Sequence, residues 1–181
     1  MNILFESELI LNQNGSVYHL GLRPEHIAND IITVGDPDRV EAVSKYFDKV
    51  TYVNQVREFK TACGELNGKF LTVISTGIGT DNVDIVLNEI DFLVNYNLET
   101  RTKNEVKKAI NIYRVGTSGS ISKEVELDSV VYSNAAISFE RLFDFYKHNF
   151  ESISFDNKHY SVIPCSSKLK TIFSRYSSSL T

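Results

Sequence analysis

Three glycine-containing turns each follow a run of apolar or β-branched residues that is typical of a buried strand. They occupy residues 35–39, 75–79 and 114–119. Glycine at the end of a strand lets the backbone approach a ligand, and in open α/β sheets ligands collect at the carboxyl ends of strands. Two of the turns carry an arginine, Arg39 and Arg114, whose guanidinium can hold phosphate through two parallel hydrogen bonds. The pattern therefore predicts a phosphate site.

The three turns do not match the glycine-rich motifs of common nucleotide sites. None has the spacing of a P-loop or of a dinucleotide-binding GxGxxG turn, which disfavours ATP and NAD. No group of residues has the spacing of a metal site, so no metal is expected. No organic cofactor is expected either. Taken singly, each turn is a weak signal, because Gly-Asp-Pro is a common turn and an arginine in a first helical turn is usually solvated.

The composition favours a soluble globular protein, with residues 1–181 forming a single domain. Of the 181 residues, 42% are hydrophobic and 23% are charged, which is enough to bury a core. A formal net charge of −4 argues against a nucleic-acid partner and against a basic membrane-binding surface. The N-terminus lacks the long apolar run of a signal peptide or a membrane span. Cys63 and Cys165 stand in unrelated contexts and predict reduced thiols and a cytoplasmic location.

Strands alternate with helices along the chain, which predicts an α/β domain. A helix should begin at Asp36-Pro37, and Asn67-Gly68 should form a hairpin turn. Strands are predicted at 31–34, 50–56, 59–66, 70–75 and 109–115, with a further strand seeded by Val130 and Val131. Helical periodicity predicts a helix at 81–96 whose core-facing residues are Val83, Val86, Leu87, Ile90 and Leu93. Two more helices are predicted, one at 138–148 and one through Leu169, Ile172, Phe173 and Tyr176, while residues 99–108 are interpreted as a loop or a solvated helix end.

Five segments, taken together and in order, resemble uridine phosphorylases, within the wider purine nucleoside and uridine phosphorylase superfamily. They are HLGL at 19–22, GDPDRV at 35–40, REF at 57–59, STGIG at 75–79 and RVGTSG at 114–119. Their order and approximate spacing match the family over roughly residues 15–140. The resemblance implies a three-layer α/β/α sandwich whose central mixed sheet is partly barrel-like. It also implies a homodimer with sites shared across the interface, often assembled into a homohexamer.

The resemblance also implies roles for individual residues. Phosphate would be held by residues of one subunit and by one arginine of its neighbour, namely Gly35, Arg39, Arg114 and Thr117 from the first and Arg57 from the second. The nucleoside would be contacted by three residues of the last motif and by a histidine that crosses the interface to the ribose 5′-hydroxyl, namely Thr117, Ser118, Gly119 and His19. No residue is identified as a catalytic acid or base. Without the resemblance, His19 is interpreted as a surface histidine and Arg57-Glu58 as an ion pair at a strand edge.

The implied activity is the reversible phosphorolysis of a nucleoside, uridine foremost, to free base and ribose 1-phosphate. Such an enzyme is a pentosyltransferase of nucleotide salvage, with the nucleoside and inorganic phosphate as its small-molecule partners. Arginines at the phosphate would fix the nucleophile and neutralise its charge. A nucleosidase of the same superfamily is the alternative enzyme, but it uses water and has no need of Arg39, Arg57 and Arg114.

The C-terminal part of the family pattern is not found in this sequence. The Glu-Met-Glu type of segment that holds the ribose hydroxyls in the family is not present, and the only methionine is Met1. The resemblance thus predicts an incomplete domain that carries mainly the phosphate half of the site. Three explanations stay open: a fragment, the product of a truncated gene, or a divergent, non-catalytic protein that uses the phosphate site for binding or assembly.

Overall fold

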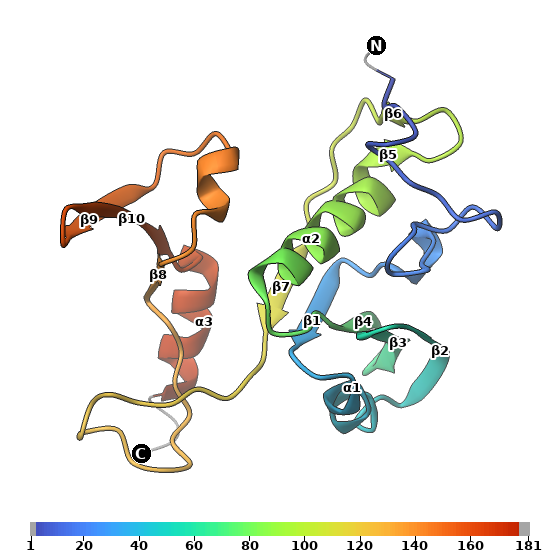
Figure 1. Ribbon diagram of the computed structural model, residues 1–181. Helices are drawn as coiled ribbons and strands as arrows, with labels where there is room; N and C mark the ends of the chain where they lie inside the picture. The colour runs from blue at the N-terminus through green and yellow to red at the C-terminus, as the bar shows by residue number, and fades with distance from the viewer. Residues whose placement is uncertain (1–2, 178–181) are drawn as a thin grey trace. The chain divides into compact units, whose positions relative to one another are not determined.

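The computed structural model describes residues 3–177 and divides into two compact units, Met1–Thr117 and Ser118–Thr181 (Figure 1). Each unit has a sheet of its own. No helix among the described residues is both long enough and apolar enough to cross a membrane.

The first unit is built around an open, mixed sheet of five strands in the order β2-β3-β4-β1-β7. The strands are β1 (Asp30–Val34), β2 (Lys49–Val56), β3 (Phe59–Leu66), β4 (Lys69–Ser75) and β7 (Asn111–Arg114). β1 runs parallel to both of its neighbours, β4 and β7, whereas β2, β3 and β4 form an antiparallel meander. All five strands lie where the sequence predicts them. β2 and β7 are the edges, so the sheet does not close into a barrel within the described residues.

Two tight turns connect the meander. Asn67 and Gly68 join β3 to β4 with φ angles of 51° and 73°, the conformation of a two-residue type I′ hairpin turn, which confirms the prediction. Arg57 and Glu58 join β2 to β3. Arg57 has a φ of 54°, a left-handed conformation that is uncommon for a residue with a side chain.

Helix α1 (Pro37–Ser44) begins where the sequence predicts. The carboxylate of Asp36 accepts a 2.8 Å hydrogen bond from the backbone N–H of Asp38, so Asp36 is the N-cap. The buried side chain of Val40 packs α1 against one face of the sheet. Its buried partners there are Val34, Ala62 and Val73.

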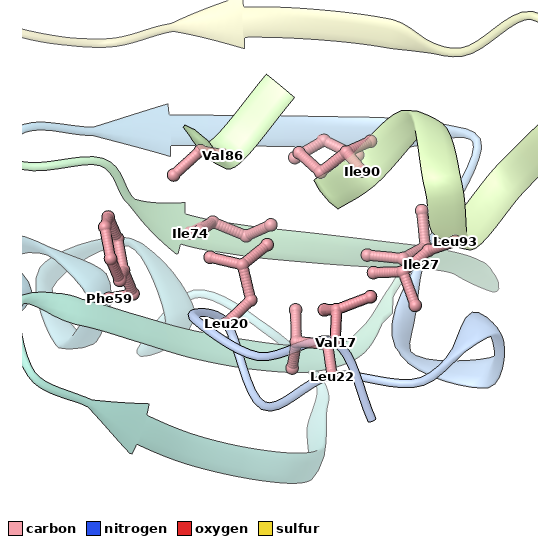
Figure 2. Packing of buried hydrophobic residues seen from close by; sticks show 10 residues of the cluster. Val17, Leu20, Leu22, Ile27, Phe59, Ile74, Val86, Ile90 and Leu93 are labelled. Atoms are coloured by element: carbon pink, nitrogen blue, oxygen red, sulfur yellow. The ribbon is translucent and has the colours of Figure 1, made fainter. Parts of the chain in front are cut away.

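Helix α2 (Thr80–Asn95) covers the opposite face of the sheet. Ile74 of β4 belongs to the core cluster of α2, whereas its neighbour Val73 belongs to that of α1. Adjacent residues of a strand point to opposite sides of the sheet, so the two helices lie on opposite faces. Figure 2 shows Val86, Ile90 and Leu93 of α2 directed toward the sheet and toward the N-terminal segment, residues 3–29. The other buried members of this core cluster are Val17, Leu20, Leu22, Ile27, Ile31, Phe59 and Ile74. The sheet therefore lies between two helical layers. The predicted stripe is confirmed at its three buried residues, but Leu87 is 44% exposed, and Glu89 is buried on the core side instead.

Residues 99–108 form part of a small hairpin rather than a plain loop or a helix end. β5 (Tyr96–Asn97) follows α2 directly and pairs with β6 (Thr102–Lys103) in a two-stranded antiparallel sheet. The N-terminal segment joins this hairpin through a bridge between Ile3 and Thr102. It then leads through the 3₁₀ helix η1 (Pro24–His26) into β1.

Among its described residues, the second unit contains a three-stranded antiparallel sheet in the order β8-β10-β9 and one α-helix. Its elements are β8 (Ala135–Ser138), the 3₁₀ helix η2 (Leu142–Phe145), β9 (Glu151–Phe155), β10 (Lys158–Pro164) and α3 (Ser167–Ser177). The predicted last helix is confirmed over Leu169, Ile172 and Phe173. The side chain of Tyr176 lies outside the described part of the chain.

Two predictions for the second unit are wrong. Val130 and Val131 are 87% and 65% exposed and lie in no strand, because β-branched residues favour a strand only where neighbouring strands pair with it. The helix predicted at 138–148 is reduced to η2, and Ser138 belongs to β8. One aromatic residue of that segment packs on the hairpin instead: Phe139 lies edge-on against Tyr160, with ring centroids 5.1 Å apart.

Candidate functional site

The three glycine-containing turns meet at one edge of the five-stranded sheet. β1, β4 and β7 are parallel neighbours, with Val34 opposite Ser75 and Thr33 opposite Arg114. The carboxyl ends of these three strands therefore lie side by side, and each leads into one of the turns. This edge is where ligands bind in open α/β sheets.

Gly35 leaves room for the guanidinium of Arg114. A Cβ atom at Gly35 would lie 3.1 Å from Nη2 of Arg114 and 3.3 Å from the side chain of Ile78. A Cβ atom at Gly116 would lie 3.1 Å from Nη1 of the same arginine. Nη1 donates a 2.6 Å hydrogen bond to the backbone carbonyl of Val115. The two glycines and this bond hold the guanidinium of Arg114 beside the turn that follows β1.

A second guanidinium reaches the same edge from α1. Nη2 of Arg39 donates a 3.4 Å hydrogen bond to the hydroxyl of Thr117. Arg39 lies in the first turn of α1, whose N-terminal N–H groups favour an anion. Asp36 already occupies one of these N–H groups with its own carboxylate, so an anion would rely on the remaining N–H groups and on the two arginines. The structure thus brings together four predicted phosphate residues, Gly35, Arg39, Arg114 and Thr117.

Arg57, the fifth predicted phosphate residue, makes no hydrogen bond to the other four within the described residues. Its backbone carbonyl accepts a 3.0 Å hydrogen bond from Gln55, but within the described residues its exposed guanidinium forms no hydrogen bond or ion pair. The alternative of a pair with Glu58 is not realised, because Oε1 of Glu58 accepts a 2.9 Å hydrogen bond from Asn82. The role of Arg57 at a neighbouring subunit's phosphate stays a prediction.

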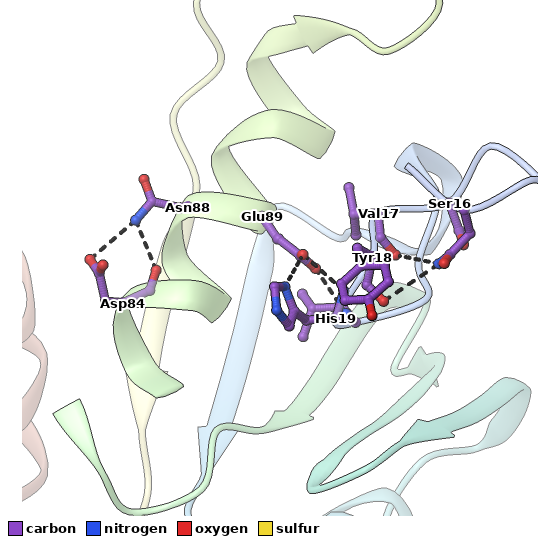
Figure 3. A network of polar contacts seen from close by, with 9 residues as sticks. Ser16, Val17, Tyr18, His19, Asp84, Asn88 and Glu89 are labelled. Carbon is purple, nitrogen blue, oxygen red and sulfur yellow. Dashed lines mark hydrogen bonds and ion pairs between the residues drawn. The ribbon is translucent and has the colours of Figure 1, made fainter. Parts of the chain in front are cut away.

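His19 is held by a carboxylate that the sequence did not single out (Figure 3). Nδ1 of His19 lies 2.7 Å from Oε1 of Glu89, and the side chains are 26% and 9% exposed respectively. Tyr18 packs edge-on against the imidazole, with ring centroids 4.9 Å apart. The available signal was the position of Glu89, three residues after Val86 and four before Leu93, in the middle of the buried stripe of α2. The interpretation of His19 as an ordinary surface histidine does not fit this environment.

Ser118 and Gly119, predicted to line the nucleoside, belong to the second unit. Both residues are exposed within that unit. Their role stays a prediction.

The buried thiol of Cys63 has no catalytic environment. Burial raises its pKa from 9.0 to about 11, and its Sγ donates a 3.2 Å hydrogen bond to the backbone carbonyl of His26. A thiol with so high a pKa is a poor nucleophile at neutral pH, and Cys63 serves as a small core residue.

In the described part of the chain, no group of three His, Cys, Asp or Glu residues is arranged to hold a metal ion.

Comparisons with known proteins place the chain in a family. A family model described as the phosphorylase superfamily matches residues 30–173. The uridine phosphorylase of Escherichia coli is 32% identical over 126 residues, which cover 68% of this chain and 44% of that enzyme. A DeoD-type purine nucleoside phosphorylase of Alkaliphilus metalliredigens is 29% identical over 119 residues, which cover 65% of this chain and 46% of that protein.

A solved structure matches as well. The crystal structure of a Trypanosoma brucei nucleoside phosphorylase, which shows uridine phosphorylase activity, superimposes with a TM-score of 0.72 and 34% sequence identity. The match covers 76% of this chain and 47% of that one. This chain therefore spans less than half the length of each of these three relatives.

Proposed function

We propose that this chain, which belongs to the phosphorylase superfamily, contributes the phosphate-binding part of a site that cleaves nucleosides with inorganic phosphate. The reaction is the reversible phosphorolysis of a nucleoside, uridine foremost, to free base and ribose 1-phosphate. The catalyst is a glycosyltransferase of the pentosyltransferase type that works in the cytoplasm. It needs no cofactor, and inorganic phosphate is its co-substrate.

One observation carries the proposal: the guanidinium groups of Arg39 and Arg114 reach the same sheet edge beside Gly35. The carboxyl ends of β1 and β7 and the first turn of α1 meet there. Guanidinium forks and exposed backbone N–H groups together make a site suited to a phosphate dianion. The chain as a whole is acidic, with a net charge of −4, so this cluster is a local exception that fits a small anion.

Phosphorolysis needs this arrangement because the nucleophile is itself an anion. Phosphate must approach the anomeric carbon while the sugar gains oxocarbenium character and the base leaves with negative charge. Arg39 and Arg114 would screen the charge of the phosphate and fix its direction of approach, so catalysis comes from positioning and electrostatics. A nucleosidase activates water instead, and water gives no reason to gather two guanidinium groups at one point.

We further propose that the site is completed across a homodimer, the unit from which a homohexamer can assemble. The exposed guanidinium of Arg57 is available to a neighbouring subunit, and His19 would meet the ribose 5′-hydroxyl there. Thr117, Ser118 and Gly119 would line the nucleoside in the same chain as Arg114. The uridine phosphorylases among the relatives support uridine as the first substrate to test.

The test is release of base from uridine, with thymidine and inosine alongside, in the presence and absence of phosphate. Uracil that appears only with phosphate supports the proposal, whereas release without phosphate would make the protein a nucleosidase. Titration calorimetry with inorganic phosphate, for the unmodified chain and for Arg114→Ala, tests the phosphate site separately from turnover. Arg23→Ala is a matched control, since it removes one guanidinium that is hydrogen-bonded to Asn14. Equal phosphate affinity in all three proteins would contradict the proposed site.

A further inference from the structure

Glu89 has a buried carboxylate on a helix face that is otherwise apolar. Among the described residues, it is the only charged residue that is buried. It lies on the core-facing side of α2 between Val86 and Leu93. A buried carboxylate is costly unless its oxygen atoms are hydrogen-bonded. Its partners therefore indicate what it does.

Among the described residues, the hydrogen-bond partners of the carboxylate come from one turn about 70 residues earlier in the chain (Figure 3). Oε1 accepts a 2.9 Å hydrogen bond from the backbone N–H of His19, and Oε2 accepts a 2.8 Å hydrogen bond from the backbone N–H of Leu20. Oε1 also lies 2.7 Å from Nδ1 of the His19 imidazole. Both oxygens thus accept backbone hydrogen bonds, and an ionised Glu89 takes the proton of the Oε1–Nδ1 contact from the imidazole.

This contact decides which nitrogen of a neutral His19 carries the proton. With the proton on Nδ1, Nε2 keeps a lone pair and acts as an acceptor. Nε2 has no hydrogen-bond partner among the described residues. The ring is also fixed from the side, because Tyr18 packs against it at an interplanar angle of 87°. His19 is therefore an oriented imidazole with one unsatisfied acceptor.

The imidazole also borders open space. His19, Glu89, Asp84 and Asn88 line a cavity of about 220 Å³ against the N-terminal segment. With a side chain that is 26% exposed, His19 is accessible to a partner from outside the chain.

We propose that Glu89 is a positioning residue for His19. It holds the imidazole as the Nδ1–H tautomer, so that Nε2 accepts a hydrogen bond from a sugar hydroxyl. This inference rests on the proposed function, in which that hydroxyl is the 5′-hydroxyl of a nucleoside bound in a neighbouring subunit. Glu89 thereby gives the site its preference for a 5′-hydroxylated sugar, although it touches no substrate itself.

A purely structural role is the competing explanation, because Glu89 also satisfies two backbone N–H groups of the turn. Loss of the carboxylate would then loosen the turn and lower activity on every substrate alike. A positioning role predicts a loss that depends on the 5′-hydroxyl and on His19.

The tautomer can be measured without any turnover. In the 181-residue chain labelled with ¹⁵N-histidine, Nδ1 of neutral His19 should give a pyrrole-like shift and Nε2 a pyridine-like shift. The signals are assigned by their loss in His19→Asn. In Glu89→Gln the two shifts should average or exchange, whereas Asp91→Asn, an exposed carboxylate-to-amide change on the same helix, should leave them unchanged. An Nε2–H tautomer in the unmodified chain would overturn the proposal.

Kinetics then test the consequence. Glu89→Gln should lower kcat/KM for uridine by about ten- to a hundredfold, the range found for carboxylate partners that orient metal-binding histidines. It should leave kcat/KM for 5′-deoxyuridine within about twofold, and it should add nothing in the His19→Asn background. Equal losses on both substrates would overturn the positioning role. Failure of the unmodified chain to cleave any nucleoside would count against the proposed function instead, while the tautomer measurement would still report on Glu89.

Discussion

Nη2 of Arg39 donates a 3.4 Å hydrogen bond to the hydroxyl of Thr117, a residue 78 positions further along the chain. This contact ties the first turn of α1 to the segment that follows β7. It also places a hydroxyl donor next to a guanidinium at the proposed phosphate site. The pair is therefore a sensitive place to test whether this sheet edge binds an anion.

Thr117→Val should weaken phosphate binding by about tenfold, since a hydrogen bond to a charged group contributes roughly 1.5–3 kcal/mol. The change removes both the anchor of Arg39 and one donor to phosphate, while it nearly keeps the side-chain volume. Thr117→Ser is the matched control, because it keeps the hydroxyl and should retain most of the affinity. Calorimetric titration with phosphate measures both. If valine and serine behave alike, the hydroxyl plays no part.

Gly35→Ala should also weaken phosphate binding, but without unfolding the chain. The new Cβ would lie 3.1 Å from Nη2 of Arg114, so the guanidinium must shift by a few tenths of an ångström and its fork would no longer match the phosphate. Gly79→Ala is the control, since nothing lies within 4 Å of a Cβ built there. Phosphate affinity and the thermal midpoint are compared for both variants. A loss of the same size in Gly79→Ala would show that crowding of Arg114 is not the cause.

The two cysteines should differ in reactivity in the folded chain. Burial raises the pKa of Cys63 to about 11, so only about a thousandth of this thiol is ionised at pH 8. Cys165 is partly exposed. Iodoacetamide at pH 8 should modify one thiol rapidly in the native chain and both after unfolding in denaturant, as read by mass spectrometry of peptides. Rapid modification of native Cys63 would contradict its burial.

The same thiol gives a pH dependence of stability with a defined sign. The folded chain holds the Cys63 proton more tightly than the unfolded chain, in which the thiol titrates at its ordinary pKa of 9.0. Its contribution to stability is therefore complete below about pH 9 and is lost as the pH rises through about 11. Urea unfolding of the chain and of Cys63→Ala across this range measures the contribution, and the difference between the two proteins should shrink as the pH rises.

Local signals predicted the first unit well because each was supported by its neighbours. Asp36 and Pro37 start α1, and Asn67-Gly68 forms the hairpin that sets the register of β3 against β4. The apolar run of β1 is covered on both faces, so its burial is visible in sequence. The meeting of Gly35 with Arg114 required strand order, which no local pattern contains.

The failures have physical causes that a single sequence hides. Glu89 looks like a solvated helix residue until the turn at His19 and Leu20 supplies three donors. Val130 and Val131 have strand propensity, but they pair with no strand among the described residues of the second unit. The turn at Asp156 and Asn157, with φ angles of 48° and 56°, makes the β9–β10 hairpin, but its residues are weaker turn signals than Asn-Gly.

Arg57 provides the test of the shared site. Its guanidinium is exposed and forms no contact with Arg39 or Arg114 in the described part of the chain, so a role at phosphate requires a second subunit. Arg57→Ala should therefore lower phosphate-dependent turnover about tenfold or more, the loss expected when a charged hydrogen-bond partner is removed. The thermal midpoint should be unchanged, since the side chain is exposed. Arg57→Lys, which keeps the charge and loses the fork, should fall between the two.

Mixing two inactive variants decides between the shared site and a local one. In a dimer of one Arg57→Ala chain with one Arg114→Ala chain, one of the two sites receives Arg114 from the first chain and Arg57 from the second. Unfolding and refolding the two variants together in equal amounts should restore about a quarter of the sites, because half of the dimers are mixed and each has one complete site. If each arginine served only its own chain, every chain in the mixture would lack one of them. No activity would then return, and the assignment of Arg57 to a neighbouring subunit would have to be withdrawn.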